Sequence, residues 1–99
     1  MQFNNKVMDC QHKTHPNIIK RLKKAYGQLN GIIKMLEKDN HQCNQIAQQM
    51  QAVYKAVGNA KSILVQDHIQ GCVENIIKNE KVNIDEKMQE LKDIAKYLS

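Results

Sequence analysis

The chain has 99 residues and a mass of 11.4 kDa, a length that supports one domain at most. With 41% hydrophobic and 25% charged residues it is predicted to be globular, which excludes a disordered chain. No apolar run approaches the roughly 18 residues of a membrane-spanning helix, and the N-terminal residues lack the apolar segment of a signal peptide, so we expect a cytoplasmic protein without a membrane partner.

The first predicted helix runs from about Pro16 to Lys38. Its apolar residues alternate in steps of four and three, which is the spacing of a helix stripe: Ile18, Leu22, Ala25, Leu29, Ile32 and Leu36. Pro16 suits the first turn, where its missing N–H is not needed. The turn-prone residues 39–42 then end the pattern.

The second predicted helix runs from about Cys43 to Lys78. Its apolar residues repeat at coiled-coil spacing: Ile46, Met50, Val53, Val57, Ala60 and Leu64. At about 1.5 Å per residue this helix is about 50 Å long, which a chain of this size cannot cover on all sides. The uncovered apolar surface predicts an obligate homo-oligomer with this helix at its centre.

The third predicted helix runs from about Ile84 to Leu98, with Asn83 as its N-cap and Glu86 three residues later. No strand pattern is present, so the predicted fold is all-α with three helices per chain. Residues 1–14 are polar and are predicted to form a flexible N-terminal arm, which leaves residues 15–99 as a single helical domain.

The excess positive charge lies in the first third of the chain. Residues 1–38 carry eight basic and two acidic side chains, whereas residues 39–99 carry seven and eight. A one-sided basic surface is what phosphate binding requires, although a solvated lysine-rich helix face is the simpler alternative. The residues that we expect to contact double-stranded DNA are Lys20, Arg21, Lys23, Lys24, Gln28, Lys55 and Lys61.

The three cysteines are widely spaced and odd in number, which argues against a secreted disulfide scaffold and for reduced thiols. His68 and Cys72 are four residues apart and share one helix face, a spacing that can chelate a metal. Cys43 lies 25 residues before His68, about 37 Å along a continuous helix. Antiparallel pairing of two chains would bring Cys43 of one to His68 and Cys72 of the other, which predicts an intersubunit Cys–His–Cys site.

The stretch from Arg21 to Ile32, with its Gly-Gln-Leu-Asn-Gly run, resembles the first-helix signature of the copper-sensitive operon repressor family. The resemblance extends from about residue 18 to residue 98, and its most specific part is the spacing of Cys43, His68 and Cys72. It implies an all-helical repressor of operator DNA. Members of the family sense Cu(I), Ni(II) or Co(II), formaldehyde, or persulfides.

In the copper members of that family, the positions of Cys43, His68 and Cys72 form a trigonal Cu(I) site across the dimer. The resemblance further implies that antiparallel four-helix-bundle dimers assemble into a tetramer. It places Glu90 beside the metal ligands, and Cys10 near an N-terminal histidine that the nickel and cobalt members use as an extra ligand. His12 and His15 follow Cys10 and are further auxiliary candidates.

The chain also departs from the family pattern. Gln42 stands where copper members often carry a tyrosine, and Tyr54 stands near a common DNA-contacting arginine, with Lys55 beside it. The loop before Cys43 is one residue longer than usual. These departures concern the surroundings of the predicted metal and DNA sites, not the three predicted ligands.

The donor set favours Cu(I) as the effector, because thiolates select soft ions and three ligands suit a three-coordinate Cu(I). A tetrahedral Zn(II) site needs a fourth ligand, which the N-terminal arm could supply, so Zn(II), Ni(II) and Co(II) remain alternatives. Persulfide sensing would use Cys43 and Cys72 as a resolving pair and would leave His68 without a role.

No motif of an enzyme active site or of a small-molecule substrate site is present, so we predict a protein that is not an enzyme. The predicted function is a metal-responsive transcriptional repressor that binds operator DNA in the apo form and is released by Cu(I). A small cytosolic metal buffer or chaperone is a further alternative, although copper chaperones usually present their cysteines on an exposed loop.

Overall fold

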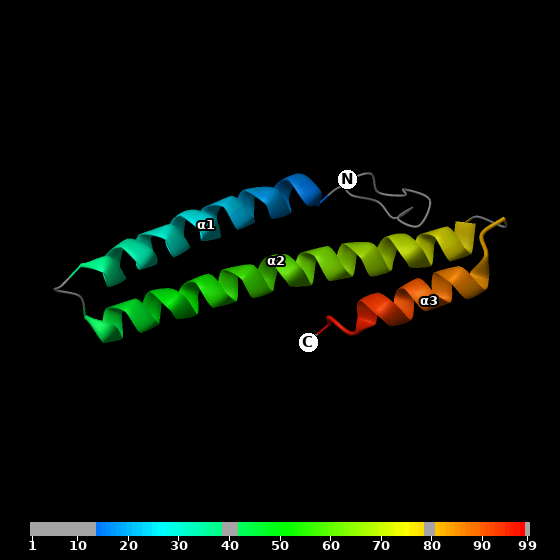
Figure 1. Ribbon diagram of the computed structural model, residues 1–99. Helices are drawn as coiled ribbons and strands as arrows, with labels where there is room; N and C mark the ends of the chain where they lie inside the picture. The colour runs from blue at the N-terminus through cyan, green and yellow to red at the C-terminus, as the bar shows by residue number, and fades with distance from the viewer. Residues whose placement is uncertain (1–13, 39–41, 79–80, 99) are drawn as a thin grey trace. The chain divides into compact units, whose positions relative to one another are not determined.

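The computed structural model describes residues 14–38, 42–78 and 81–98 (Figure 1). Three α-helices form the regular structure of these residues: α1 (His15–Glu37), α2 (Cys43–Lys78) and α3 (Ile84–Ala95). The prediction of an all-α chain with three helices is therefore confirmed for this part of the sequence. None of the three helices is both long and apolar enough to cross a membrane.

The helix bounds follow the sequence prediction closely except at the C-terminus. The observed α2 has the predicted bounds, and α1 is shifted by one residue at each end. The predicted end of the third helix at Leu98 is wrong by three residues. Beyond Ala95 the backbone tightens into a turn, in which the N–H of Tyr97 donates to the carbonyl of Ile94 at 3.0 Å and that of Leu98 to Ala95 at 3.2 Å. Such three-residue bonds satisfy the last carbonyl groups of a helix.

The start of α3 is fixed by a side-chain cap, as predicted. Asn83 has an extended backbone, with φ −78° and ψ 108°, and its Oδ1 accepts a hydrogen bond from the N–H of Glu86 at 3.2 Å. This bond satisfies one of the N–H groups that have no partner inside the helix. Asp85 and Glu86 lie in the first turn, where their negative charge favours the positive end of the helix dipole.

The chain divides into two compact units. One contains residues 15–61, and thus α1 with the first part of α2. The described part of the other consists of Thr14 and residues 62–78 and 81–98, and thus the second part of α2 with α3. Residues 1–13 of the predicted N-terminal arm lie outside the described residues, whereas the hydroxyl of Thr14 donates to Oδ2 of Asp67 at 2.9 Å. The single domain of residues 15–99 stays a prediction.

The predicted apolar stripe of α1 consists of two rows with different environments. The inner row recurs every seven residues and is 2–6% exposed: Ile18, Ala25 and Ile32. The outer row lies between these positions and is 43–50% exposed: Leu22, Leu29 and Leu36. One chain therefore covers only half of the stripe that the sequence predicts.

The first part of α2 repeats this arrangement. Ile46 and Ala60 of its inner row are buried, and Val53 between them is half-buried. Met50 and Val57 of its outer row are 53% and 44% exposed. The helices α1 and α2 thus bury one row each and present the other row to solvent.

We expect Asn83→Ala to lower the free energy of unfolding by about 1 kcal/mol, because it removes the cap of α3. Thermal unfolding followed by circular dichroism measures the change. The matched control is Asn30→Ala in the middle of α1, an exposed position where alanine is the better helix former and stability is unchanged or higher. An equal loss of stability in both variants would contradict the capping role.

Candidate functional site

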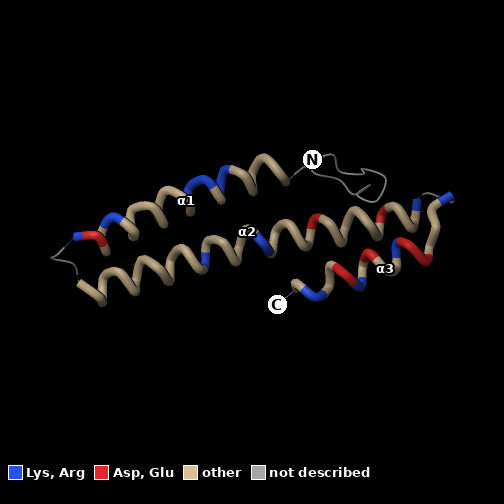
Figure 2. The backbone as a smooth tube through the Cα atoms, viewed as in Figure 1, with Lys and Arg blue, Asp and Glu red and all other residues tan. Residues whose placement is uncertain are grey.

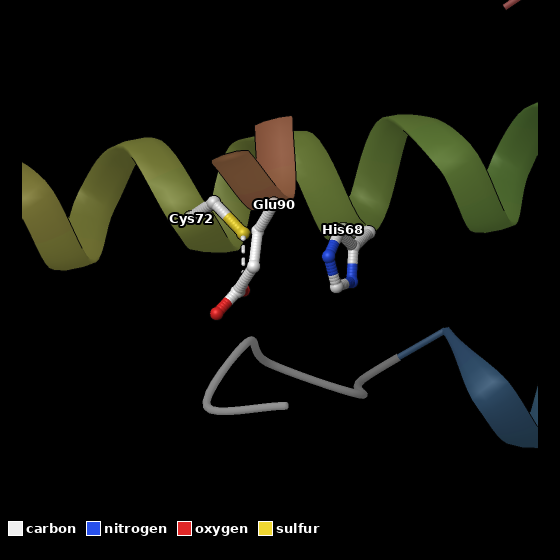
Figure 3. Close-up of side chains that lie close together, drawn as sticks. All are labelled: His68, Cys72 and Glu90. Carbon is white, nitrogen blue, oxygen red and sulfur yellow. Dashed lines mark hydrogen bonds between the residues drawn. The ribbon is translucent and has the colours of Figure 1, made fainter. Parts of the chain in front are cut away.

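His68 and Cys72 lie one turn apart on α2 and are both buried. Cys72 has no exposed surface, and His68 is 9% exposed. The four-residue spacing places both side chains on one face of the helix. Glu90 reaches the same place from α3, so that a histidine, a cysteine and a carboxylate converge (Figure 3). The structure therefore brings His68 and Cys72 together on one face, and Glu90 lies beside them, where the family resemblance places it.

The donor atoms of this cluster are close enough to share one ion. One ligand atom of each of the three residues can be chosen so that all lie within 4.8 Å of one another. This is near the separation of two ligands on opposite sides of an ion with bonds of about 2.0–2.3 Å. The thiol of Cys72 donates a hydrogen bond to Oε1 of Glu90 at 3.6 Å, which is drawn as a dashed line in Figure 3. The cluster thus offers sulfur, nitrogen and oxygen donors in a largely buried place.

A lysine that the sequence analysis did not single out lies beside this cluster. The ammonium nitrogen of Lys87 lies 3.6 Å from Oε1 of Glu90, the same oxygen that accepts from Cys72. Lys87 is 6% exposed, and within the described part of the chain its ammonium has no hydrogen-bond partner. Lys87 lies three residues before Glu90, a helix spacing that allows the ion pair. Nothing in the sequence marks this lysine as buried.

The other predicted metal ligands do not join the cluster in one chain. Cys43 is exposed at the first residue of α2 and is not part of the group formed by His68, Cys72 and Glu90. His15 is the half-buried first residue of α1 and is also outside that group. Cys10 and His12 lie outside the described residues. The metal roles of these four residues stay predictions.

A second feature is a groove between α1 and the first part of α2, which we call the basic groove. Four of the seven predicted DNA-binding residues line it, together with two asparagines and two alanines: Asn17, Lys20, Arg21, Lys24, Gln28, Ala52, Ala56 and Asn59. The predicted residues Lys23, Lys55 and Lys61 are exposed but do not line the groove. All of the charged side chains that line the groove come from α1, whereas α2 contributes the two alanines and Asn59.

One side chain of the basic groove is held in place by another. Nε of Arg21 donates to Oδ1 of Asn17 at 3.3 Å, one turn away on α1. This bond fixes part of the guanidinium and leaves its remaining donors for a ligand. Asn17 and Asn59 were not predicted as site residues, although the four-residue spacing of Asn17 and Arg21 is a local signal in the sequence.

The two units differ in their balance of basic and acidic side chains (Figure 2). In residues 15–61, eight basic side chains face only one described acidic side chain, Glu37. In residues 62–98, five basic and six acidic side chains are described. The basic groove therefore lies in the strongly positive unit, and the cluster of His68, Cys72 and Glu90 lies in the nearly neutral one.

Comparisons with known proteins agree on one class. A family model for metal-sensitive transcriptional repressors matches residues 14–97. The copper-sensing transcriptional repressor CsoR of Bacillus subtilis is 33% identical over 99 residues, covering 97% of this chain and 95% of that protein. The copper-sensing transcriptional repressor RicR of Mycobacterium tuberculosis is 31% identical over 74 residues, covering 75% and 76%. CsoR of Mycobacterium ulcerans is 37% identical over 54 residues, covering 54% and 45%. No solved structure shows a significant match.

We expect Glu90→Gln to lower the free energy of unfolding by about 1–3 kcal/mol, because it leaves the buried ammonium of Lys87 without a negative partner. Adding Lys87→Met should recover most of this loss, since the double variant buries no unpaired charge. Chemical denaturation of the wild type, the two single variants and the double variant gives the coupling free energy between the two side chains. Strictly additive effects would show that Lys87 and Glu90 do not interact.

Proposed function

The chain belongs to the metal-sensitive transcriptional repressor family, and we propose that it binds operator DNA as the apo protein and is released when Cu(I) binds. We place the Cu(I) site between two chains of a homo-oligomer in the cytoplasm. The observation that carries the proposal is the convergence of buried His68 and Cys72 on one face of α2. The copper-sensing relatives support the choice of metal.

The described donors fit a soft ion. Cu(I) prefers thiolate sulfur and accepts imidazole nitrogen, which Cys72 and His68 supply. Cys43 of a second chain provides the third ligand in this proposal. It is a free and exposed thiol, and so it is accessible to a partner. Metal binding requires that the thiols release their protons to solvent.

The exposed outer rows of α1 and α2 support pairing of two chains. Leu22, Leu29, Met50 and Val57 leave a large share of their apolar surface in water. An apolar face that repeats every seven residues is the surface through which helices pair. We therefore retain the antiparallel four-helix-bundle dimer, and the tetramer formed from two dimers, as proposals.

The basic groove is the proposed DNA surface. Lys20, Arg21 and Lys24 present three positive charges along one side of it, and Gln28 and Asn59 add amide donors. Such groups bind phosphate oxygens, which position a protein on DNA without reading bases. No helix-turn-helix spacing is visible, and we propose recognition through phosphate contacts and DNA shape.

The helix α2 connects the two activities in this proposal. It carries Ala52, Ala56 and Asn59 of the basic groove as well as His68 and Cys72. When Cys43 binds the metal ion held by His68 and Cys72 of a second chain, one arrangement of the paired helices would be favoured. We propose that this arrangement binds DNA less tightly. By linkage, the factor lost in DNA affinity equals the factor lost in Cu(I) affinity on DNA.

One observation favours a second candidate, a repressor that responds to a divalent ion. The carboxylate of Glu90 lies among the donors of the cluster. Together with His68, Cys72 and Cys43 of a second chain it would complete four ligands, which is the number that a tetrahedral Zn(II) site requires. Anaerobic titration with Cu(I), Zn(II) and Ni(II) in the presence of competing chelators, followed by DNA binding of each form, decides between the two candidates.

We expect charge reversal at Lys20 and Lys24 to abolish binding to the operator and to leave Cu(I) binding intact. Fluorescence anisotropy with labelled upstream DNA measures the affinity. For the wild type, log affinity should fall with log salt with a slope of about −0.9 per phosphate contacted. The matched control reverses Lys92 and Lys96, which are also four residues apart and exposed, and gives the same change in net charge. Equal losses in both double variants would indicate a net-charge effect and move the DNA surface away from the groove.

We expect Cys43→Ala to lose tight Cu(I) binding while its apo form still binds DNA, because the substitution removes a ligand and no positive charge. Full release of this variant from DNA by Cu(I) in a gel shift would contradict the proposed ligand set.

Mixing two inactive variants tests whether the site is shared between chains. Refolded mixtures of Cys43→Ala and Cys72→Ala chains should recover one strong Cu(I) site per heterodimer, because one of the two sites then has both cysteines. Each variant refolded alone is the control and should have no strong site. If mixing restores nothing, Cys43 does not complete the site of a second chain.

A further inference from the structure

The buried ammonium of Lys87 has no role in the fold that its contacts explain. Lysine side chains usually extend their charged end to water, because burial of an ammonium carries a large desolvation cost. Lys87 is 6% exposed, and its nitrogen lies 3.6 Å from a single oxygen of Glu90. That oxygen also accepts the thiol hydrogen bond of Cys72. One carboxylate, shared in this way, is a weak counterpart for a buried positive charge.

We propose that Lys87 sets the charge preference of the metal site, so that it favours a monovalent over a divalent ion. This inference rests on the proposed function, in which Cys72, His68 and Cys43 of a second chain hold the ion. Lys87 is not itself a ligand. It acts through its positive charge, which lies next to the carboxylate that contacts Cys72.

The complexes of a monovalent and a divalent ion in this site differ by one unit of charge. A monovalent ion held by two thiolates and a neutral imidazole forms a complex with a net charge of −1, whereas a divalent ion in the same ligand set forms a neutral one. Glu90 adds one negative charge in both cases. The ammonium of Lys87 therefore meets one more negative charge when Cu(I) is bound than when Zn(II) is bound. Attraction between unit charges about 6–12 Å apart, at an effective dielectric constant of about 20, corresponds to about a tenfold to hundredfold change in affinity.

A structural role alone would have different consequences. If Lys87 served only to hold Glu90 in place, its removal would disturb the cluster for every metal and would lower the stability of the apo protein. If it acts through charge, its removal weakens the binding of Cu(I) selectively. The two roles are therefore separated by the ratio of the Cu(I) and Zn(II) affinities.

The test compares Lys87→Met with the wild type under anaerobic conditions, with Cu(I) competed against bicinchoninate and Zn(II) against a fluorescent chelator. We expect Cu(I) affinity to fall about tenfold to a hundredfold and Zn(II) affinity to change by less than about threefold. Lys87→Arg retains the charge and should retain the preference for Cu(I). Lys92→Met, an exposed lysine on the same helix, is the matched control and should leave both affinities unchanged.

Equal weakening of Cu(I) and Zn(II) in Lys87→Met, or an unchanged Cu(I) affinity, would overturn the inference and leave the proposed function standing. A wild-type protein that binds no Cu(I) would overturn the proposed function itself. If Lys87→Met does not fold, Lys87→Gln removes the same charge with a polar side chain, and the same ratio of affinities decides.

Discussion

The length of α2 is the constraint on which the rest of the structure depends. A helix of 36 residues needs cover along its whole length, and the chain offers α1, of 23 residues, to its first part and α3, of 12 residues, to its second. This cover buries Ile46 and Ala60 but leaves Met50 and Val57 exposed. The exposed row is therefore a consequence of chain length, and it is the physical reason to expect a second chain. In the proposed dimer, a partner that covers the outer row would also bring its own cluster of donors to the exposed Cys43.

The three groups of residues on α1 form neighbouring stripes along the helix. The outer row is apolar and exposed, the inner row beside it packs within the chain, and the residues of the basic groove follow on the far side of the inner row. Successive residues turn by about 100° on a helix, so a period of seven keeps each row in its own stripe. Pairing through the outer row would therefore leave Lys20, Arg21 and Lys24 available to phosphates. The bond between Asn17 and Arg21 orients one of these groups in advance.

The cluster on α2 and α3 combines possible metal ligands with a buried ion pair. A thiol, a carboxylate and an ammonium form a short chain in which Oε1 of Glu90 contacts both Cys72 and Lys87. A metal ion that replaces the thiol proton changes the charge at one end of this chain. The buried ammonium at the other end cannot be screened by water as a surface lysine would be. In the proposed site, this arrangement would make the stability of the metal complex depend on the charge of the ion.

Features set by neighbours in the chain followed from the sequence alone. The bounds of α2, the Asn83 cap of α3 and the common face of His68 and Cys72 all depend on residues within one or two turns of each other, where helix geometry is fixed. The end of α3 was misplaced because Leu98 continues the apolar stripe, while the backbone closes into a turn after Ala95. Glu90 was suggested by a family resemblance, and its contact with Cys72 spans 18 residues. The burial of Lys87, and the split of each stripe into a covered and an uncovered row, were decided only by tertiary structure, because burial depends on which elements pack together and leaves no mark in local spacing.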